Sequence, residues 1–206
     1  MKKFFFLSLF AVVLFSCSSQ ENIGNPSKGE YKYLTDNIVW KVLLTDEECI
    51  GPSCSHLEEI KVAGDTIINN VKYRIVDNIP VREQGNKIYC YTWDPLEQKV
   101  HEVLIYDFGV KKGDKVRILI DGRMGDKQTY YAIVTDVEIV TLLDDRKARK
   151  ISYDYRSTDL EYIGHLAGGF SRPFVGMTID YKYLCCTESG VLLHESYEGA
   201  CDENFR

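Results

Sequence analysis

The chain has 206 residues, with 25 basic and 31 acidic side chains, a formal net charge of −6, and 45% hydrophobic and 12% aromatic residues. This length suffices for one substantial core, and the composition excludes disorder for the bulk of the chain. The acidic balance argues against a partner attracted by charge alone, whether nucleic acid or an anionic bilayer.

The first seventeen residues predict export and anchoring to a membrane. Two lysines precede an apolar run over residues 4–15, which is typical of a secretory signal peptide and is shorter than the roughly 20 residues of a spanning helix. Residues 14–17 (LFSC) resemble a bacterial lipobox, in which the cysteine is lipidated and the chain is cleaved just before it. We therefore expect a signal peptide over residues 1–16, a lipid on Cys17 and a place in the cell envelope, at the outer membrane, with periplasmic or outward orientation left open.

Removal of residues 1–16 takes away two lysines and no acidic residue, which leaves 23 basic and 31 acidic side chains and a net charge of −8. Residues 17–29 are small and polar and contain Pro26, so after the lipidated cysteine they predict a flexible tether. The remainder, residues 30–206, is expected to form a single β domain.

Short segments with a period of two, bounded by turn residues, follow one another along this remainder. Asn69-Asn70, Gln84-Gly85-Asn86 and Ser189-Gly190 favour hairpin turns between them. The segment 160–170, rich in glycine and apolar residues, predicts a buried loop. The predicted strands are 38–44, 65–68, 71–75, 81–83, 87–93, 101–106, 116–120, 129–140, 147–153, 181–186 and 191–194.

No segment shows a sustained helical period, and turn signals recur about every 8–12 residues. The pattern predicts an all-β fold, in which an antiparallel meander closes into a barrel or folds into two packed sheets. The strand over 147–153 is strongly basic, and we expect its charges to protect an exposed edge or solvated face, with a patch for an anionic partner as the alternative.

Six cysteines remain once Cys17 carries lipid, and in an exported chain they are candidates for disulfides. Cys49 and Cys54 flank a Gly-Pro turn and suit a local bridge. Cys185 and Cys186 are adjacent, so on a strand they would point to opposite faces and take different partners. Buried free thiols are the alternative for some of the six. The candidates are Cys49, Cys54, Cys90, Cys185, Cys186 and Cys201, and the last of these is placed to staple the tail.

Several short motifs together resemble a loose family of uncharacterised small lipoproteins from anaerobic Gram-negative bacteria. They occur between residues 64 and 193 and consist mostly of turn and strand chemistry: Gly64 to Asn69 with Tyr73, Tyr106-Asp107-Phe108 with Gly113-Asp114, the basic segment 146–150, Ile163-Gly164 and Gly168-Gly169. The resemblance implies a lipid-anchored β domain and supplies no catalytic residues.

The sequence contains no catalytic motif and no spacing typical of a metal or cofactor site. The four histidines, His56, His101, His165 and His194, are the candidates for a general base, and we expect each to be locally hydrogen-bonded or on the surface. A cysteine with a spatially adjacent histidine stays open as a hydrolase alternative, because such sites are set by geometry rather than by order in the chain.

Aromatic residues are the strongest binding signal, because Tyr89, Tyr91 and Trp93 alternate along one predicted strand and share one face. We expect this face to point inward, as core or as the lining of a ligand cavity; an outward face would be a platform for a sugar or a protein. The sequence thus favours a non-catalytic β domain that binds a glycan, a small apolar ligand or an envelope protein. A structural or accessory subunit of an envelope complex is the alternative.

Overall fold

The computed structural model describes residues 31–46, 55–94, 96–121, 127–154, 158–165 and 179–202. The predicted signal peptide, Cys17, the tether and the Cys49/Cys54 pair lie outside these residues. The described residues are all β, with antiparallel pairing throughout, as the sequence predicts. Among them, no helix has the length and hydropathy needed to cross a bilayer.

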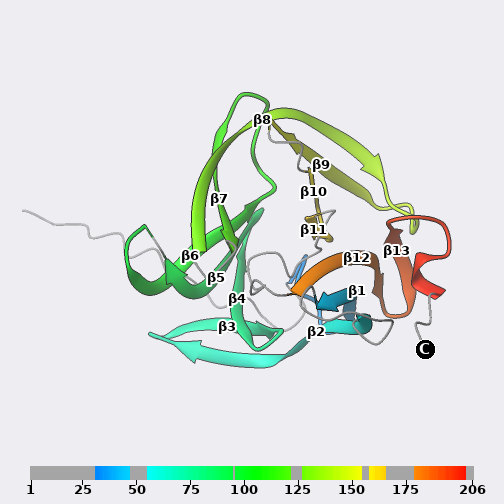
Figure 1. Cartoon of the computed structure of the whole chain (residues 1–206), viewed down its shortest axis with the longest axis horizontal. Helices are drawn as coiled ribbons and strands as arrows, with labels where there is room; N and C mark the ends of the chain where they lie inside the picture. Colours follow the sequence, from blue (N-terminus) through cyan, green and yellow to red (C-terminus); the bar gives the residue numbers. More distant parts are fainter. Residues whose placement is uncertain are drawn as a thin grey trace, which may run out of the picture.

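The strands form two sheets, which Figure 1 shows as a lower group around β1 and β2 and a long β8–β9 hairpin arching over it. Sheet order is β13-β12-β1-β2-β3-β4-β5-β6 in the first and β11-β10-β9-β8-β7 in the second, so most neighbours in sequence are neighbours in space. The elements are β1 (Ile38–Asp46), β2 (Ser55–Ile68), β3 (Val71–Val76), β4 (Ile79–Gln84), β5 (Lys87–Asp94), β6 (Lys99–Asp107), β7 (Lys115–Asp121), β8 (Lys127–Thr141), β9 (Lys147–Tyr153), β10 (Thr158–Leu160), β11 (Gly164–His165), β12 (Ile179–Glu188), β13 (Val191–Glu195) and the 3-10 turn η3 (Ala200–Asp202).

One long strand bends each sheet, β2 in the first and β8 in the second. Along β2 the register shifts between Val62 and Asp65, where Gly64 has a φ of 130°, a conformation that suits glycine. A second shift lies between Val134 and Asp136 on β8. Each bulge lets one strand pair with different neighbours along its two halves, so that the sheet curves over the core.

Tight turns set the register of the meander. Asn69-Asn70, as predicted, and Asp77-Asn78 both have positive φ at the two central positions of their turns. A two-residue type I′ hairpin turn requires this conformation, and its twist matches that of the flanking strands. Asn and Asp tolerate this conformation better than other non-glycine residues. The β2–β3–β4 meander therefore follows from local chemistry.

The buried side chains of both sheets form one cluster. Trp40 of β1 is fully buried and donates its indole N–H to the carbonyl of Tyr162 in the β10–β11 turn, at 3.2 Å. A backbone hydrogen bond of 2.9 Å from Leu143 to Leu193 joins the β8–β9 turn to β13. Within the described residues the ladders leave two sheets around a shared core rather than one closed barrel.

The segment before β1 crosses between the sheets and is bound by two carboxylates. Glu83 of β4 accepts the backbone N–H groups of Lys32, Tyr33 and Leu34, at 2.6, 2.9 and 3.0 Å. Glu161, buried in the β10–β11 turn, accepts the Tyr33 hydroxyl at 2.8 Å and the Lys32 ammonium at 2.5 Å. The segment therefore links β4 of one sheet to the β10–β11 turn of the other.

Replacing Glu83 tests this link. Glu83→Ala removes the acceptor of three N–H groups and is expected to lower the free energy of unfolding by about 2–4 kcal/mol in urea denaturation. The matched control is Glu138→Ala, because Glu138 is half exposed and has one ammonium contact at 3.3 Å, with Lys150; its expected cost is below about 0.5 kcal/mol. Equal destabilisation by the two variants would contradict the proposed role of Glu83.

Candidate functional site

The aromatic strip of β5, defined as Tyr89, Tyr91 and Trp93, faces away from the core. The alternate residues Ile88 and Cys90 are fully buried in the core, whereas the side chain of Trp93 is 46% exposed. The expectation of an inward face is therefore wrong: the small and β-branched residues of β5 fill the interior, and the large rings lie outside. This places the strip on the outer face of the first sheet.

A polar network lies beside the strip on the same face. The Arg82 guanidinium on β4 donates two hydrogen bonds of 2.7 Å to the two carboxylate oxygens of Glu102 on β6. The Tyr73 hydroxyl on β3 donates to the same carboxylate at 3.0 Å. The network thus joins side chains from three strands across the face on which the strip lies.

Burial gives this network its electrostatic character. Tyr73 is 3% exposed, and burial together with its hydrogen bond to Glu102 raises its pKa to about 12. Burial by itself raises the pKa of Glu102, but the hydrogen bonds from Arg82 outweigh this and lower it overall. At neutral pH Tyr73 is therefore a donor, Glu102 an anion and Arg82 a cation.

The network holds two of the three rings of the strip in place. The Arg82 guanidinium lies 4.9 Å from the centroid of the Tyr89 ring. Tyr91 packs edge-on against Tyr73, with ring centroids 6.1 Å apart and planes at 70°. The strip is consequently a preformed surface rather than a set of free side chains.

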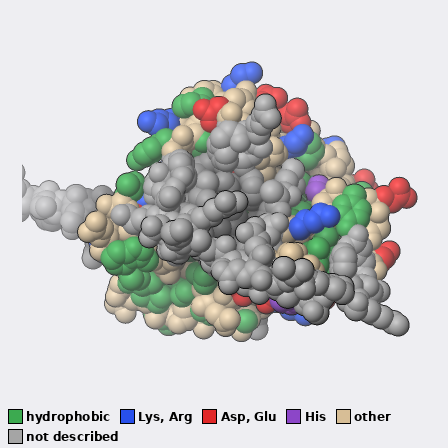
Figure 2. All heavy atoms as spheres, in the orientation of Figure 1, with side chains coloured by type: hydrophobic (Ala, Val, Ile, Leu, Met, Phe, Trp, Pro, Cys, Tyr) green, Lys and Arg blue, Asp and Glu red, His purple; other side chains and the backbone are tan. Residues whose placement is uncertain are grey.

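The exposed end of the strip continues onto the turn between β5 and β6. Trp93 pairs with Val100 across this hairpin, and Val100 and Leu96 are 54% and 57% exposed. Figure 2 shows hydrophobic side chains gathered at the corner where Figure 1 draws the hairpin. The strip therefore ends in an apolar tip made of Trp93, Leu96 and Val100.

Asp94 organises this tip from beneath. Its side chain is fully buried, and it accepts hydrogen bonds from the backbone N–H of Leu96 at 2.9 Å, from Arg117 of β7 at 2.5 Å and from the ring of His101 at 2.8 Å. Burial opposes the charge, yet these donors hold the pKa of Asp94 well below its usual range. The carboxylate is thus ionised and fixes the turn against β7.

Three side chains at the β5–β6 turn are of types that can bind a metal ion. Ligand atoms of Asp94, Glu97 and His101 lie within 4.8 Å of one another. However, both oxygens of Asp94 already accept hydrogen bonds, and the Arg117 guanidinium beside it disfavours a second cation. The residues do not fit a metal centre, and we assign them a positioning role for the turn.

The role of Asp94 can be tested by its pH dependence. Asp94→Asn is expected to lower the free energy of unfolding by about 2 kcal/mol at pH 7, because it weakens charged hydrogen bonds. Since the native pKa is depressed, the contribution of the carboxylate is complete above about pH 4, the ordinary aspartate value, and is lost as the pH falls from there towards the native pKa.

The wild type and the variant should therefore converge in urea denaturation as the pH is lowered from 4 towards 2. The control is Asp136→Asn, at an exposed position on β8. A difference between wild type and Asp94→Asn that stays constant from pH 7 to pH 2 would contradict this explanation.

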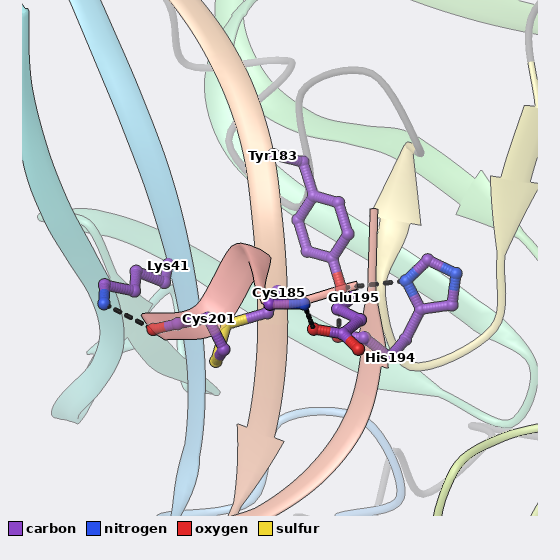
Figure 3. The surroundings of a disulfide bond; sticks show 7 residues. Lys41, Tyr183, Cys185, His194, Glu195 and Cys201 are labelled. Carbon is purple, nitrogen blue, oxygen red and sulfur yellow. Dashed lines mark hydrogen bonds between the residues drawn. A yellow bond between two sulfur atoms is a disulfide. The ribbon is translucent and has the colours of Figure 1, made fainter. Parts of the chain in front are cut away.

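The cysteines fall into two groups. A disulfide joins Cys185 of β12 to Cys201 of η3, and the Lys41 ammonium donates to the Cys201 carbonyl at 2.7 Å (Figure 3). This confirms that the last cysteine staples the tail, and it shows that Cys185 and Cys186 do not pair with each other. Cys90 and Cys186 are buried and are not disulfide-bonded, so the expectation of a disulfide is wrong for these two and the alternative of a buried thiol applies.

The sheet order explains why these thiols do not pair. Four strands lie between β5 and β12, about 24 Å along the sheet at the usual strand spacing, whereas a disulfide requires Cα atoms within about 7 Å. Burial raises the pKa of the Cys186 thiol well above its ordinary value. A protonated thiol in an apolar core is a poor nucleophile.

The described histidine side chains have local partners or lie on the surface. His194 is opposite Cys186 in the β12–β13 ladder, but its ring is directed to the Tyr183 hydroxyl at 3.2 Å (Figure 3), and burial lowers its pKa. His101 contacts Asp94, and His56 is exposed on β2. The side chain of His165 lies outside the described set.

Thiol labelling tests the cysteine assignment. Iodoacetamide should leave Cys90 and Cys186 unreacted in the native protein and label both after unfolding without reductant, as read by peptide mass mapping. Cys185 and Cys201 should react only after reduction, and Cys201→Ser should destabilise by about 3 kcal/mol, since the bridge spans 16 residues. Rapid native labelling of Cys186 would overturn the assignment.

The basic strand was predicted to protect an exposed edge or a solvated face, and the first of these is wrong. β9 lies between β8 and β10, so it is an inner strand of its sheet. The charges in and beside it have partners: Arg146, just before β9, pairs with Asp144 and with Glu188 of β12, at 2.7 and 2.6 Å, and Lys150 contacts Glu138. These contacts make a patch for an anionic partner a poor interpretation.

Sequence reasoning identified the strip but missed the network and Asp94. The hairpin around Gly85-Asn86 places Arg82 directly opposite Tyr89, and that pairing is deducible from the turn. The hydrogen bond from Tyr73 to Glu102 cannot be deduced from one turn, because it forms only when the three hairpins between β3 and β6 are in place.

No protein-family model, curated protein or solved structure matches this chain. The function is therefore argued from the geometry of the site.

Proposed function

We propose that this protein is a lipid-anchored, non-catalytic binding domain of the cell envelope, and that the aromatic strip of β5 binds a neutral glycan chain. The observation that carries the proposal is the outward face of Tyr89, Tyr91 and Trp93, with Trp93 46% exposed at its end. The predicted lipid on Cys17 and the tether would keep this surface at the membrane.

The chemistry of the strip suits a sugar. Aromatic rings offer an apolar face on which the C–H face of a pyranose ring can stack, while polar side chains beside them reach the hydroxyl groups. Alternate residues of a strand are about 6.6 Å apart, so the three rings extend over about 13 Å, long enough for more than one sugar unit. The fixed rings also reduce the entropy that binding must overcome.

The charge of the protein favours a neutral glycan over an acidic one. The mature chain is expected to carry a net charge of −8, which repels polyanions. The cation nearest the strip, Arg82, is already engaged by both oxygens of Glu102. A ligand on this face would therefore meet stacking surface rather than free positive charge.

The buried state of Cys186 and the Tyr183 contact of His194 support binding rather than hydrolysis. The exposed apolar tip favours one alternative, a structural subunit that contacts an envelope protein through Trp93, Leu96 and Val100. The test below separates a glycan from a protein partner.

Tryptophan fluorescence offers a direct test, since Trp40 is fully buried and Trp93 is half exposed. Titration with cellohexaose, maltohexaose or N-acetylchitohexaose should change the emission of Trp93 and protect it from acrylamide. Trp93→Ala should weaken binding about ten- to hundredfold, or roughly 1.4–2.8 kcal/mol, and Trp93→Phe should weaken it less.

The control is Tyr131→Ala, because Tyr131 is an aromatic residue on β8 of the other sheet that is more exposed than Trp93, at 59%. Binding that is absent for all three oligosaccharides, or that is equal in wild type and Trp93→Ala, would refute the glycan proposal.

A further inference from the structure

The apolar tip made of Trp93, Leu96 and Val100 forms the end of the β5–β6 hairpin. All residues from 96 to 100 are exposed, and Trp93 and Val100 are cross-strand partners with exposed fractions of 46% and 54%. Figure 1 draws this hairpin at the left side of the molecule. Single exposed apolar side chains are ordinary on a protein surface, but three that gather on one hairpin end indicate a contact surface.

The charged side chains around the tip occur in pairs. Glu97 and Lys99, in the turn and just after it, form an ion pair of 2.5 Å. Beneath them, the buried carboxylate of Asp94 is paired with Arg117 at 2.5 Å. The hairpin end therefore carries no excess charge from these four groups, in contrast to the net charge of −8 expected for the mature chain. Such a surface suits a partner that also lacks net charge.

The backbone of the turn is prepared for an apolar medium. The carboxylate of Asp94 accepts the N–H groups of Leu96 and Glu97, at 2.9 and 3.4 Å. A backbone N–H group that leaves water without a partner is costly, and the cost is highest in lipid. Asp94 thus satisfies two donors at the place where the apolar side chains project.

The small size of the tip favours a lipid bilayer over a protein partner. A stable protein interface takes about 20–30 residues a side, whereas the hairpin end offers Trp93 and residues 96–100. A bilayer requires only a few side chains of the correct types. Tryptophan is enriched at the level of the lipid headgroups, and leucine and valine favour the apolar layer below.

The predicted tether is long enough for this contact. The segment before β1 binds Glu83, which pairs with Ile88 of β5, and six residues of β5 separate Ile88 from Asp94, about 20 Å of strand. Residues 18–30 number thirteen, and a flexible chain of that length would span about 20 Å on average and about 45 Å when extended. A lipid on Cys17 would therefore leave the tip within reach of the same bilayer.

We propose that the tip inserts into the surface of a bilayer without net charge, with Leu96 and Val100 in the upper acyl layer and Trp93 among the headgroups. The inference rests on the proposed function, because the lipid predicted on Cys17 brings the domain to the membrane. It also places the aromatic strip, which shares Trp93 with the tip, beside the membrane surface, so that the glycan would be one displayed there.

Vesicles with an artificial anchor test the insertion. Residues 18–206 with an N-terminal hexahistidine tag are bound to phosphatidylcholine vesicles that contain a nickel-chelating lipid, so the result does not depend on lipidation of Cys17. Trp93 should lose about half of its emission when the lipid is brominated near the top of its acyl chains, because tryptophan prefers the membrane interface. The emission of Trp93 is the difference between wild type and Trp93→Phe, and the fully buried Trp40 should not be quenched.

Variants locate the contact. Leu96→Asp and Val100→Asp each place a charge on the tip and should reduce the quenching about fivefold, because a carboxylate is unfavourable in the acyl layer. The matched control is Ile139→Asp, since Ile139 is 66% exposed on β8 of the other sheet, and it should be quenched as the wild type is. Circular dichroism of each variant ensures that lost quenching is not lost folding.

Three results would overturn the proposal: an unquenched Trp93 in the wild type, equal quenching in the wild type and Leu96→Asp, or quenching that appears only when phosphatidylglycerol is added. An unquenched Trp93 together with dimerisation in solution that Leu96→Asp abolishes would assign the tip to a protein interface instead.

Oligosaccharide titration without vesicles keeps the two proposals apart. Oligosaccharide binding with an unquenched Trp93 would refute the insertion and leave the glycan proposal standing. Quenching of Trp93 without any oligosaccharide binding would refute the glycan proposal and leave the insertion standing.

Discussion

The contact on which the architecture most depends is the buried carboxylate of Glu161. It accepts hydrogen bonds from the Tyr33 hydroxyl, the Lys32 ammonium and the backbone N–H of Arg149 in β9. Because Glu83 of the other sheet binds the backbone of the same segment, this short stretch of chain adds a link between two carboxylates to the shared core that joins the sheets. Sheets that meet only through side-chain packing can slide, whereas directional hydrogen bonds to a buried anion fix one relative position.

This fixed position has a consequence for the outer face of the first sheet. With the interior filled by residues such as Ile88 and Cys90, the large rings of β5 have to lie outside, where an aromatic side chain without support would be mobile. The buried Arg82–Glu102 pair provides that support, since Arg82 lies over Tyr89 and Glu102 holds Tyr73 against Tyr91. Two of the three rings of the strip are therefore held against neighbouring side chains.

Much of the fold was predictable because it is locally encoded. The positive-φ pairs Asn69-Asn70 and Ser189-Gly190 fix two-residue turns, and alternation then defines the strands on either side. The strip was predictable as a set of residues sharing one face, but not its direction, since alternation is identical for an inward and an outward face. The direction of the face depends on which side chains of the neighbouring strands fill the core. Local patterns also did not predict three other features, because these depend on strands that meet only after folding. They are the bulges near Gly64 and Val134, the position of β9 inside its sheet and the long-range contacts of Asp94.

The two buried arginines of the β3–β4 hairpin share one arrangement. Arg74 and Arg82 are only 4% and 7% exposed, each lies over a tyrosine ring, and each is paired with carboxylate. Buried ion pairs are weak contributors to stability, and apolar residues of similar size would often serve the fold as well or better. Their value lies in holding polar and aromatic groups in one geometry. One unit orders the aromatic strip and the other orders Tyr31 beside the opposite face of β3, which packing alone does not require.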